Sequence, residues 1–241
     1  MNRLTTITKK IFRYSNYLGL LTWWMIKVKL YYNSKYLNKK VLEIDQKGLF
    51  IDCGSNIGQS FEFFQKFYQT KNFDYMLFEP NPYCFRVLKE KYVHQESYSP
   101  EIMEQAVGVE NRKLNFYGIN ENFGGKYSLG GTLNPEHNSN LKNYSTDRGI
   151  IVNSINFSEL LRDTILPKKY SFLVLKLDIE GSEYDVLESL IDNNQIKTFN
   201  IIFVEFHSKY MKPDIAKKYK KREKLILKSI RKSGTKIVKW I

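Results

Sequence analysis

Leu49–Gly58, LFIDCGSNIG, is the stretch of sequence that decides the fold of this chain. Its apolar run, Leu49–Ile51, is typical of a short inner strand in a parallel sheet. Gly54 and Gly58 then predict a tight turn into a helix, because glycine permits backbone conformations and close approaches that other residues resist. Ligands of open α/β sheets bind at the carboxyl ends of such strands. The stretch therefore predicts a ligand site at this turn, with Asp52 as its fixed acid.

A second strand with an acid at its tip follows. Phe73–Phe78 is again strand-like and ends in Glu79, which lies 27 residues after Asp52. The turn Pro80–Pro82 then begins another helix. An acid in this position binds a ribose diol in comparable folds, and a carboxylate suits two hydroxyl donors because it offers only acceptors. The two strands together predict a ligand that contains a nucleoside.

The glycine turn has the spacing D-x-G-x-N-x-G. This spacing differs from the dinucleotide fingerprint G-x-G-x-x-G, and it lacks the Lys-Ser/Thr of a phosphate-binding P-loop. Taken alone, the turn is also compatible with a structural strand-turn-helix that binds nothing.

Four blocks of sequence follow one another along the chain: FIDCGSNIGQS (Phe50–Ser60), FEPNPYCF (Phe78–Phe85), QAVGVENRKLNFY (Gln105–Tyr117) and VLKLDIEGSEYDVL (Val174–Leu187). They resemble the FkbM-type S-adenosylmethionine-dependent methyltransferases, within the larger Rossmann-like class. The fourth is the most specific, because K-x-D-x-E-G-x-E at the end of a hydrophobic strand is much rarer than a glycine turn. With a weaker fifth block, IIFVEFH, they span Phe50–His207 and leave both ends uncovered.

The resemblance implies a set of residues that bind S-adenosylmethionine. The glycine turn would surround the methionine portion, Glu79 would bind the ribose, and the end of the third strand would lie at the adenine edge. Asn81 or Phe78 would pack against the base. The implied cofactor residues are Asp52, Gly54, Asn56, Gly58, Glu79, Asn81, Gln105 and Ala106.

Methyl transfer is dominated by positioning, but a hydroxyl acceptor must lose a proton. Glu205 and His207 end the fifth predicted strand and, two residues apart, would share a face. His207 is the natural base near neutral pH, although it could also be a surface histidine. Asp178 could orient the acceptor or hold the cofactor's amino group. Asp178, Glu180 and Glu205 offer oxygen ligands suited to Mg²⁺, and Lys176 could neutralise these acids.

Alternating strands and helices predict a doubly wound, mostly parallel Rossmann-like α/β sheet with helices on both faces. The section 118–150 is rich in Gly, Asn, Ser and Tyr and predicts a functional loop or an ordinary insertion. The predicted strands are 49–51, 73–78, 101–107, 112–117, 172–177, 199–206 and 235–241, and the predicted helices are 58–68, 82–92, 157–161, 186–191 and 214–232.

The length of 241 residues and a hydrophobic content of 42% suit one catalytic domain, residues 48–241, after a helical extension at 1–47. Cys53 and Cys84 are predicted to be reduced, in a cytoplasmic compartment. The three histidines are scattered along the sequence, which disfavours a structural metal site. Trp23 and Trp24 lie in an apolar stretch too short to span a bilayer; it is expected to pack on the core or to lie in a membrane interface.

The net charge of +13 is concentrated at the two ends of the chain. Residues 1–47 carry ten Lys or Arg against two acids and residues 209–241 carry thirteen against two, which leaves a net charge of −6 between them. Basic ends could hold nucleic acid, a phospholipid surface or a phosphorylated glycan, or could be solvated faces. No nucleic-acid-binding motif accompanies them, so nucleic acid is disfavoured.

Together these observations predict an O-methyltransferase that acts on a hydroxyl-bearing small molecule or glycan, most plausibly a sugar of a polysaccharide, glycolipid or glycosylated natural product. The basic ends keep an RNA-directed methyltransferase open as an alternative. A non-catalytic, membrane-associated scaffold with the same fold is a third reading, which the intact motifs disfavour.

Overall fold

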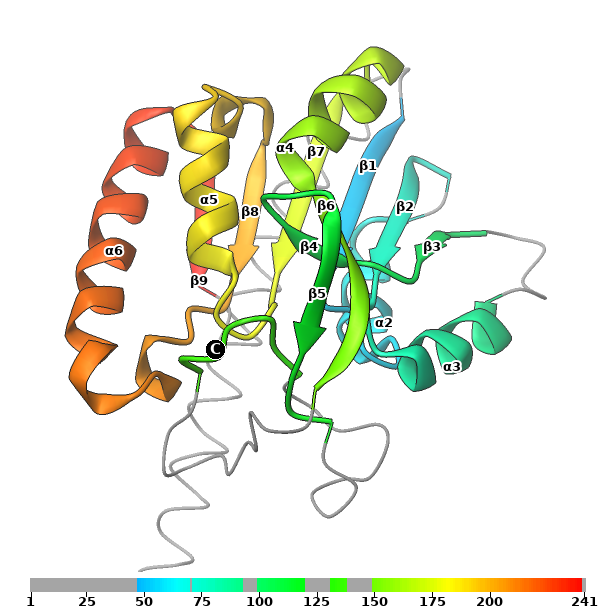
Figure 1. The fold of residues 1–241 in the computed structure, drawn as a ribbon. Coiled ribbons are helices and arrows are strands. Elements are labelled where there is room, and N and C mark those ends of the chain that lie inside the picture. The colour runs from blue at the N-terminus through cyan, green and yellow to red at the C-terminus, as the bar shows by residue number, and fades with distance from the viewer. Residues whose placement is uncertain (1–46, 70, 93–98, 120–130, 138–148, 240–241) are drawn as a thin grey trace, which may run out of the picture.

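A six-stranded sheet forms the centre of the computed structural model, which describes residues 47–69, 71–92, 99–119, 131–137 and 149–239 (Figure 1). The strand order is β3-β2-β1-β7-β8-β9, and every neighbouring pair is parallel. This confirms the predicted doubly wound α/β fold, with its switch point between β1 and β7. The strands are β1 (Gly48–Cys53), β2 (Phe73–Phe78), β3 (Glu101–Met103), β7 (Phe172–Leu177), β8 (Ile201–Val204) and β9 (Lys236–Lys239).

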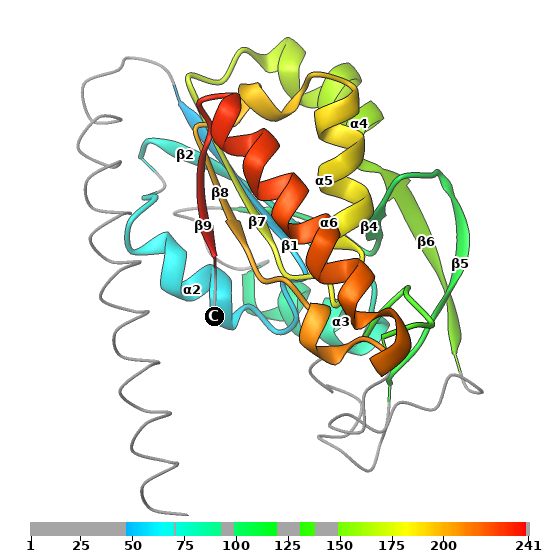
Figure 2. The same cartoon turned by 90° about the vertical axis from the view of Figure 1, so that its left-hand side faces the viewer.

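Helices cover both faces of this sheet (Figures 1 and 2). Leu49 and Ile51 of β1 belong to the core under α4, α5 and α6, whereas Phe50 packs with the aromatic side chains of α2. This alternation follows from the pleat, which turns successive side chains to opposite faces. The helices are α2 (Gln59–Gln65), α3 (Pro82–Tyr92), α4 (Phe157–Leu160), α5 (Glu183–Asp192) and α6 (Pro213–Lys232), with a π-helical turn at Leu161–Ile165 and short 3-10 turns at Leu166–Lys168, Ile196–Thr198 and Ser208–Tyr210.

The predicted third strand, 101–107, is two strands in two sheets, so that prediction was wrong. β3 pairs with β2 only as far as Phe78↔Met103, because β2 ends at Phe78 and offers no further partner. The chain then crosses to β4 (Ala106–Gly108), which pairs with β6 (Ile150–Asn156) in a three-stranded sheet of order β4-β6-β5. β5 (Arg112–Phe116) runs antiparallel to β6.

Strand β6 was not predicted, and the sequence places it directly after the irregular section. Val152 and Ser154 are buried while Ile151 and Asn153 are exposed, which is the pattern of a strand with one covered face. Asn156 ends the strand and caps α4, since its side-chain oxygen accepts the N–H groups of residues 158 and 159. The partners of β6 are far away in sequence, so local pattern alone does not reveal the second sheet.

Strand β8 is shorter than the predicted strand 199–206. It ends at Val204, although the N–H of Glu205 still donates to the carbonyl of Leu177 at 2.9 Å. His207 already has non-strand backbone angles and precedes a 3-10 turn. Glu205 and His207 therefore do not share a face as neighbours on one strand, and their proximity comes from the loop.

Residues 1–46 and most of the section 118–150 lie outside the described residues. The predicted helix around Trp23 and Trp24 therefore stays a prediction. Within the described ranges, no helix combines the length and the apolar character that crossing a membrane requires.

Candidate active site

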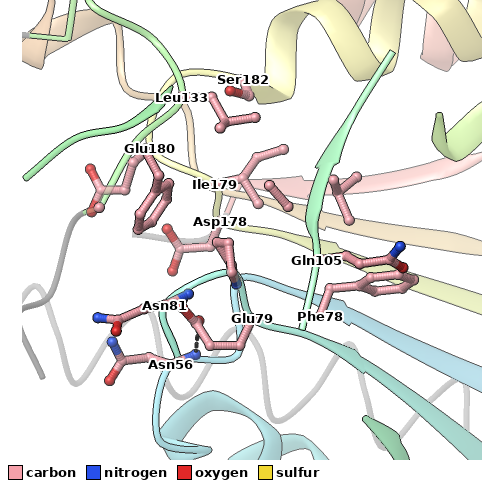
Figure 3. A pocket seen from close by; sticks show the side chains of 16 residues that line it. Asn56, Phe78, Glu79, Asn81, Gln105, Leu133, Asp178, Ile179, Glu180 and Ser182 are labelled. Carbon is pink, nitrogen blue, oxygen red and sulfur yellow. Dashed lines mark hydrogen bonds between the residues drawn. The ribbon is translucent and has the colours of Figure 1, made fainter. Parts of the chain in front are cut away.

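A pocket opens at the carboxyl ends of the central strands, where the turn after β1 meets the ends of β2 and β7 (Figure 3). Asn56 and Glu79 line one side of it, and Asp178 and Glu180 line another. β4 of the second sheet closes it through Gln105 and Ala106, the residues at its start. The switch point of the sheet thus contains a cavity with several polar groups, the usual form of a ligand site in such folds.

Glu79 is held in place by the two loops that flank the pocket. Its Oε2 accepts the N–H of Asn56 at 2.7 Å, and its Oε1 accepts the N–H of Asn81 at 2.9 Å. Burial raises the pKa of Glu79 to about 7, against the opposing effect of these two hydrogen bonds. Each carboxylate oxygen has a second lone pair, so Glu79 can still accept hydroxyl donors from a ligand.

The glycine turn passes very close to the end of β7. Gly54 has a φ of +81°, and a Cβ on it would lie 1.9 Å from the carbonyl oxygen of Asp178. The N–H of Asp178 in turn donates to the carbonyl of Cys53 at 3.1 Å. Only glycine fits this position, because both the positive φ and the close backbone exclude a side chain. The turn and the acidic loop after β7 are therefore fixed relative to each other.

A buried ion pair lies under the turn. Lys176 Nζ is 3.0 Å from Asp52 Oδ1 and donates to the carbonyl of Gly54 at 2.8 Å. Ser60 Oγ donates to the other Asp52 oxygen at 3.0 Å. Burial opposes the charge on Lys176, but the nearby Asp52 and Asp178 outweigh it and raise the pKa of this lysine. The pair ties the base of the turn to strand β7.

Acidic side chains surround His207 beside the pocket. Its Nε2 lies 3.3 Å from Glu180 Oε2, 3.6 Å from Asp178 Oδ1 and 3.8 Å from Glu205 Oε1. Its Nδ1 lies 3.3 Å from Glu183 Oε1, which also accepts the backbone N–H of His207 at 2.9 Å. Burial opposes protonation of His207, but Glu183 and the other acids raise its pKa to about 9.

A second histidine joins this group from the irregular section. His137 is buried, its Nε2 lies 3.1 Å from Glu180 Oε2, and its ring centroid lies 5.6 Å from that of His207. Burial, with the charge of Asp178, raises the pKa of Glu205 to about 7. The site thus combines the pocket with an adjoining cluster of carboxylates and imidazoles.

Comparison with known proteins identifies the family. A family model described as the methyltransferase FkbM domain matches residues 52–222. The chain belongs to the FkbM methyltransferase family. The chain is also similar to a crystal structure of the methyltransferase FkbM from Methylobacillus flagellatus KT, with 16% sequence identity and a TM-score of 0.37. That similarity covers 64% of this chain and 30% of the other. No curated protein matches the chain.

Most residues predicted to bind the cofactor line the pocket of this member of the FkbM family. Asp52 and Gly58 do not: Asp52 is buried against Lys176, and Gly58 begins helix α2 with a φ of +93°. Asp52 supports the turn through Lys176, and Gly58 closes it, since its N–H donates to the carbonyl of Ser55 at 2.8 Å. The predicted residues that line the pocket are Gly54, Asn56, Glu79, Asn81, Gln105 and Ala106.

The cluster around His207 differs from the sequence-based prediction in its members. The predicted metal ligands were Asp178, Glu180 and Glu205, whereas the residues whose ligand atoms lie within 4.8 Å of one another are Asp178, Glu180 and His207. The histidines are scattered along the sequence, but the fold brings the ring of His137 to 5.6 Å from that of His207. No motif marks His137, and only the structure reveals it.

Proposed function

We propose that the protein transfers a methyl group from S-adenosylmethionine to a hydroxyl oxygen, most plausibly of a sugar in a polysaccharide, a glycolipid or a glycosylated natural product. The observation that carries this proposal is the pocket itself, where the glycine turn and Glu79 face the acidic loop after β7. Membership of the FkbM methyltransferase family supports the transfer of a methyl group. The identity of the acceptor, and the transfer of the methyl group to an oxygen atom, are our proposals.

The cofactor would lie across the glycine turn. Glu79 would accept hydrogen bonds from the ribose diol, as acids at the tip of the second strand do in related folds. Gln105 and Ala106, on the far wall, would contact the adenine edge. Asp52 would act indirectly, because it holds Lys176, which in turn holds the carbonyl of Gly54.

The acceptor would approach from the side of Asp178. This carboxylate lines the pocket, its side chain is 26% exposed, and Figure 3 shows it pointing toward the space between Glu79 and Glu180. We therefore assign it the role of accepting the hydroxyl proton. The sequence favoured His207 for this role, but its pKa of about 9 keeps it protonated at neutral pH and unable to accept a proton.

The basic surface of helix α6 bears on the class of acceptor. The surface of α6 exposes basic side chains, which favour an acceptor on an anionic carrier or at an anionic membrane surface. The amino-terminal basic segment lies outside the described residues, so its part in such a contact stays a prediction. The exposed basic residues of α6 are Lys217, Lys218, Lys220, Lys221, Lys224, Lys228, Arg231 and Lys232.

A methyl-transfer assay tests this proposal. The full chain would be incubated with methyl-labelled S-adenosylmethionine and a panel of sugars and glycolipids, with product detected by mass spectrometry. We expect Asp178→Asn to lower kcat by about 10²–10⁴-fold and to change cofactor affinity less than threefold. The matched control is Asp163→Asn, an exposed acid on the π-helical turn. Labelling confined to RNA, or full activity of Asp178→Asn, would refute the proposal.

A further inference from the structure

We propose that His207, Asp178 and Glu180 bind a divalent transition-metal ion at the acceptor side of the pocket. The inference rests on the proposed function, because it assigns the ion the task of holding an acceptor hydroxyl. Ligand atoms of these three residues lie within 4.8 Å of one another, on the loops that follow β7 and β8. Two of the three, Asp178 and Glu180, also line the pocket.

The orientation of His207 is that of a metal ligand. Glu183 Oε1 lies 3.3 Å from Nδ1, and a carboxylate can only accept, so Nδ1 carries the hydrogen. The carboxylate of Glu183 is itself fixed, since the N–H of Gly181 donates to Oε2 at 2.7 Å. A histidine that binds a metal usually donates its other ring N–H to a carboxylate in this way. The arrangement directs Nε2 toward the acidic side chains, and a bound ion would take the place of the proton that Nε2 carries at neutral pH in the ion-free protein.

Three carboxylate oxygens converge on Nε2. Those of Glu180, Asp178 and Glu205 lie 3.3, 3.6 and 3.8 Å from it. A hydrogen on Nε2 could bond to only one of them, although Lys176 Nζ lies 3.6 Å from Asp178 Oδ2 and His137 Nε2 lies 3.1 Å from Glu180 Oε2. A metal ion between the nitrogen and the oxygens satisfies them together.

The spacing also fits a metal ion. Ligands at about 2.0–2.2 Å from a tetrahedral ion lie about 3.3–3.6 Å from one another. The distances from Nε2 to the oxygens of Glu180 and Asp178 are 3.3 and 3.6 Å. The two nitrogen–oxygen distances thus already match those around a bound ion. The two carboxylate groups lie within 4.8 Å of each other and would approach further when an ion binds.

The donor set discriminates between metals. Mg²⁺ prefers oxygen ligands and keeps several waters, whereas imidazole suits first-row transition metals. A set of one imidazole and two carboxylates thus favours Zn²⁺, Mn²⁺ or a similar ion over the Mg²⁺ that the acidic residues suggested in the sequence. His137, 3.1 Å from Glu180 Oε2, would help to hold that carboxylate in place.

The position of the ion gives it a task in the proposed reaction. Three protein ligands leave coordination positions open, and the pocket lies beside Asp178 and Glu180. A hydroxyl or a vicinal diol of a sugar could occupy them. A carboxylate that binds an ion through one oxygen keeps its second oxygen as an acceptor, so Asp178 can serve both the ion and the acceptor.

Metal titration of the full chain tests the site directly. Protein stripped with EDTA would be titrated with Mn²⁺, Zn²⁺ and Mg²⁺ by calorimetry, and the Mn²⁺ complex would be examined by pulsed electron paramagnetic resonance. We expect one equivalent of Mn²⁺ or Zn²⁺, Mg²⁺ binding at least 100-fold weaker, and a nitrogen coupling from imidazole. His207→Ala should remove the coupling and weaken Zn²⁺ binding at least 100-fold.

Two further variants separate loss of the site from loss of the fold. Glu180→Gln keeps the shape of the side chain and should weaken binding 10–100-fold, the range seen when a metal environment is impaired. Asp163→Asn changes an exposed acid away from the cluster and should bind as the wild type does. Circular dichroism and thermal melting would confirm that each variant is folded.

The inference would be overturned by a folded wild type that binds none of the ions, or by Zn²⁺ affinity that is unchanged in both His207→Ala and Glu180→Gln. In either case His207 would be an imidazolium that neutralises the acids. S-adenosylmethionine titrated into the stripped protein separates this failure from failure of the proposed function. Cofactor binding without metal binding refutes the metal site alone; metal binding without cofactor binding refutes the methyltransferase assignment alone.

Discussion

Lys176 and Asp52 lie opposite each other on adjacent parallel strands, and their charged groups are 3.0 Å apart in the interior of the protein. The side chains are 1% and 0% exposed. Lys176 also donates to the carbonyl of Gly54, so the pair fixes the position of the glycine turn relative to the sheet. Asp52, the first residue of the D-x-G-x-N-x-G motif, therefore affects the pocket indirectly, through Lys176 of the fourth sequence block.

Removal of one partner leaves a buried, uncompensated charge. Lys176→Met should lower the free energy of unfolding by about 3–5 kcal/mol, the usual cost of breaking a buried pair from one side. Denaturation by urea, followed by circular dichroism, measures this change. The same variant should weaken S-adenosylmethionine binding in protein that remains folded.

An exposed ion pair provides the control. Lys47 and Asp74 are 2.8 Å apart, with side chains 57% and 42% exposed. Lys47→Met should cost no more than about 1 kcal/mol, because water and salt already screen such a pair. Equal destabilisation by the two lysine variants would show that the buried pair has no special structural role.

The turn itself can be tested at Gly54. Both Gly54 and Gly234 have positive φ, +81° and +84°, but a Cβ on Gly234 meets nothing within 4 Å. Gly234→Ala should therefore cost only the conformational penalty of about 1–2 kcal/mol. Gly54→Ala adds a backbone clash at 1.9 Å with Asp178 and should cost more than about 4 kcal/mol or abolish cofactor binding. Similar melting temperatures for the two variants would contradict the close approach.

The raised pKa of Glu79 predicts that the affinity for the cofactor depends on pH. This pKa of about 7 means that the Glu79 carboxyl is charged above neutrality and protonated below it. A protonated carboxyl is a poorer acceptor for ribose hydroxyls, so Kd for S-adenosylmethionine should rise as pH falls from 8 to 6. Below pH 7 the rise should approach tenfold per unit. The Glu79→Gln variant should lack this pH dependence. Because the cofactor titrates equally in both experiments, the ratio of the wild-type Kd to the variant Kd at each pH isolates the contribution of Glu79.

The same raised pKa affects the stability of the ligand-free protein in the opposite direction, since stability should fall as pH rises. Because the folded-state pKa of about 7 exceeds the ordinary glutamate pKa of 4.5, the folded state binds the proton more tightly. The contribution of Glu79 is thus fully present below pH 4.5 and is lost as pH rises through 7, by about 3 kcal/mol. Urea denaturation of wild type and Glu79→Gln between pH 4.5 and 8 measures it. A constant difference between them would contradict the shifted pKa.

Local patterns predicted the central sheet well, because its strands are short apolar runs with clear ends. The runs 73–78 and 172–177 coincide with β2 and β7. Of the second sheet, only β5 was predicted, as the strand 112–117. Strand β6 was not predicted and β4 was merged with β3, because both pair with partners far along the chain and have little local signal. The absence of β6 from the prediction explains the error at residues 101–107.

The candidate site, too, could be predicted from the sequence only in part. Glu79 and Gly54 could be placed from strand ends and spacing, since parallel strands bring their carboxyl ends to one edge. The pairing of Asp52 with Lys176 required the register between β1 and β7. The meeting of His137 with His207 depends on how a long irregular section folds back, which no periodicity specifies.

Calorimetric titration with S-adenosylmethionine and S-adenosylhomocysteine tests the central claim most directly. Wild type, Glu79→Gln and Asp74→Asn would be compared, since Asp74 is a half-exposed acid near the start of β2, whereas Glu79 directly follows the end of that strand. We predict one micromolar site in wild type and Asp74→Asn, and at least tenfold weaker binding in Glu79→Gln. A folded wild-type protein that binds neither compound would contradict the account.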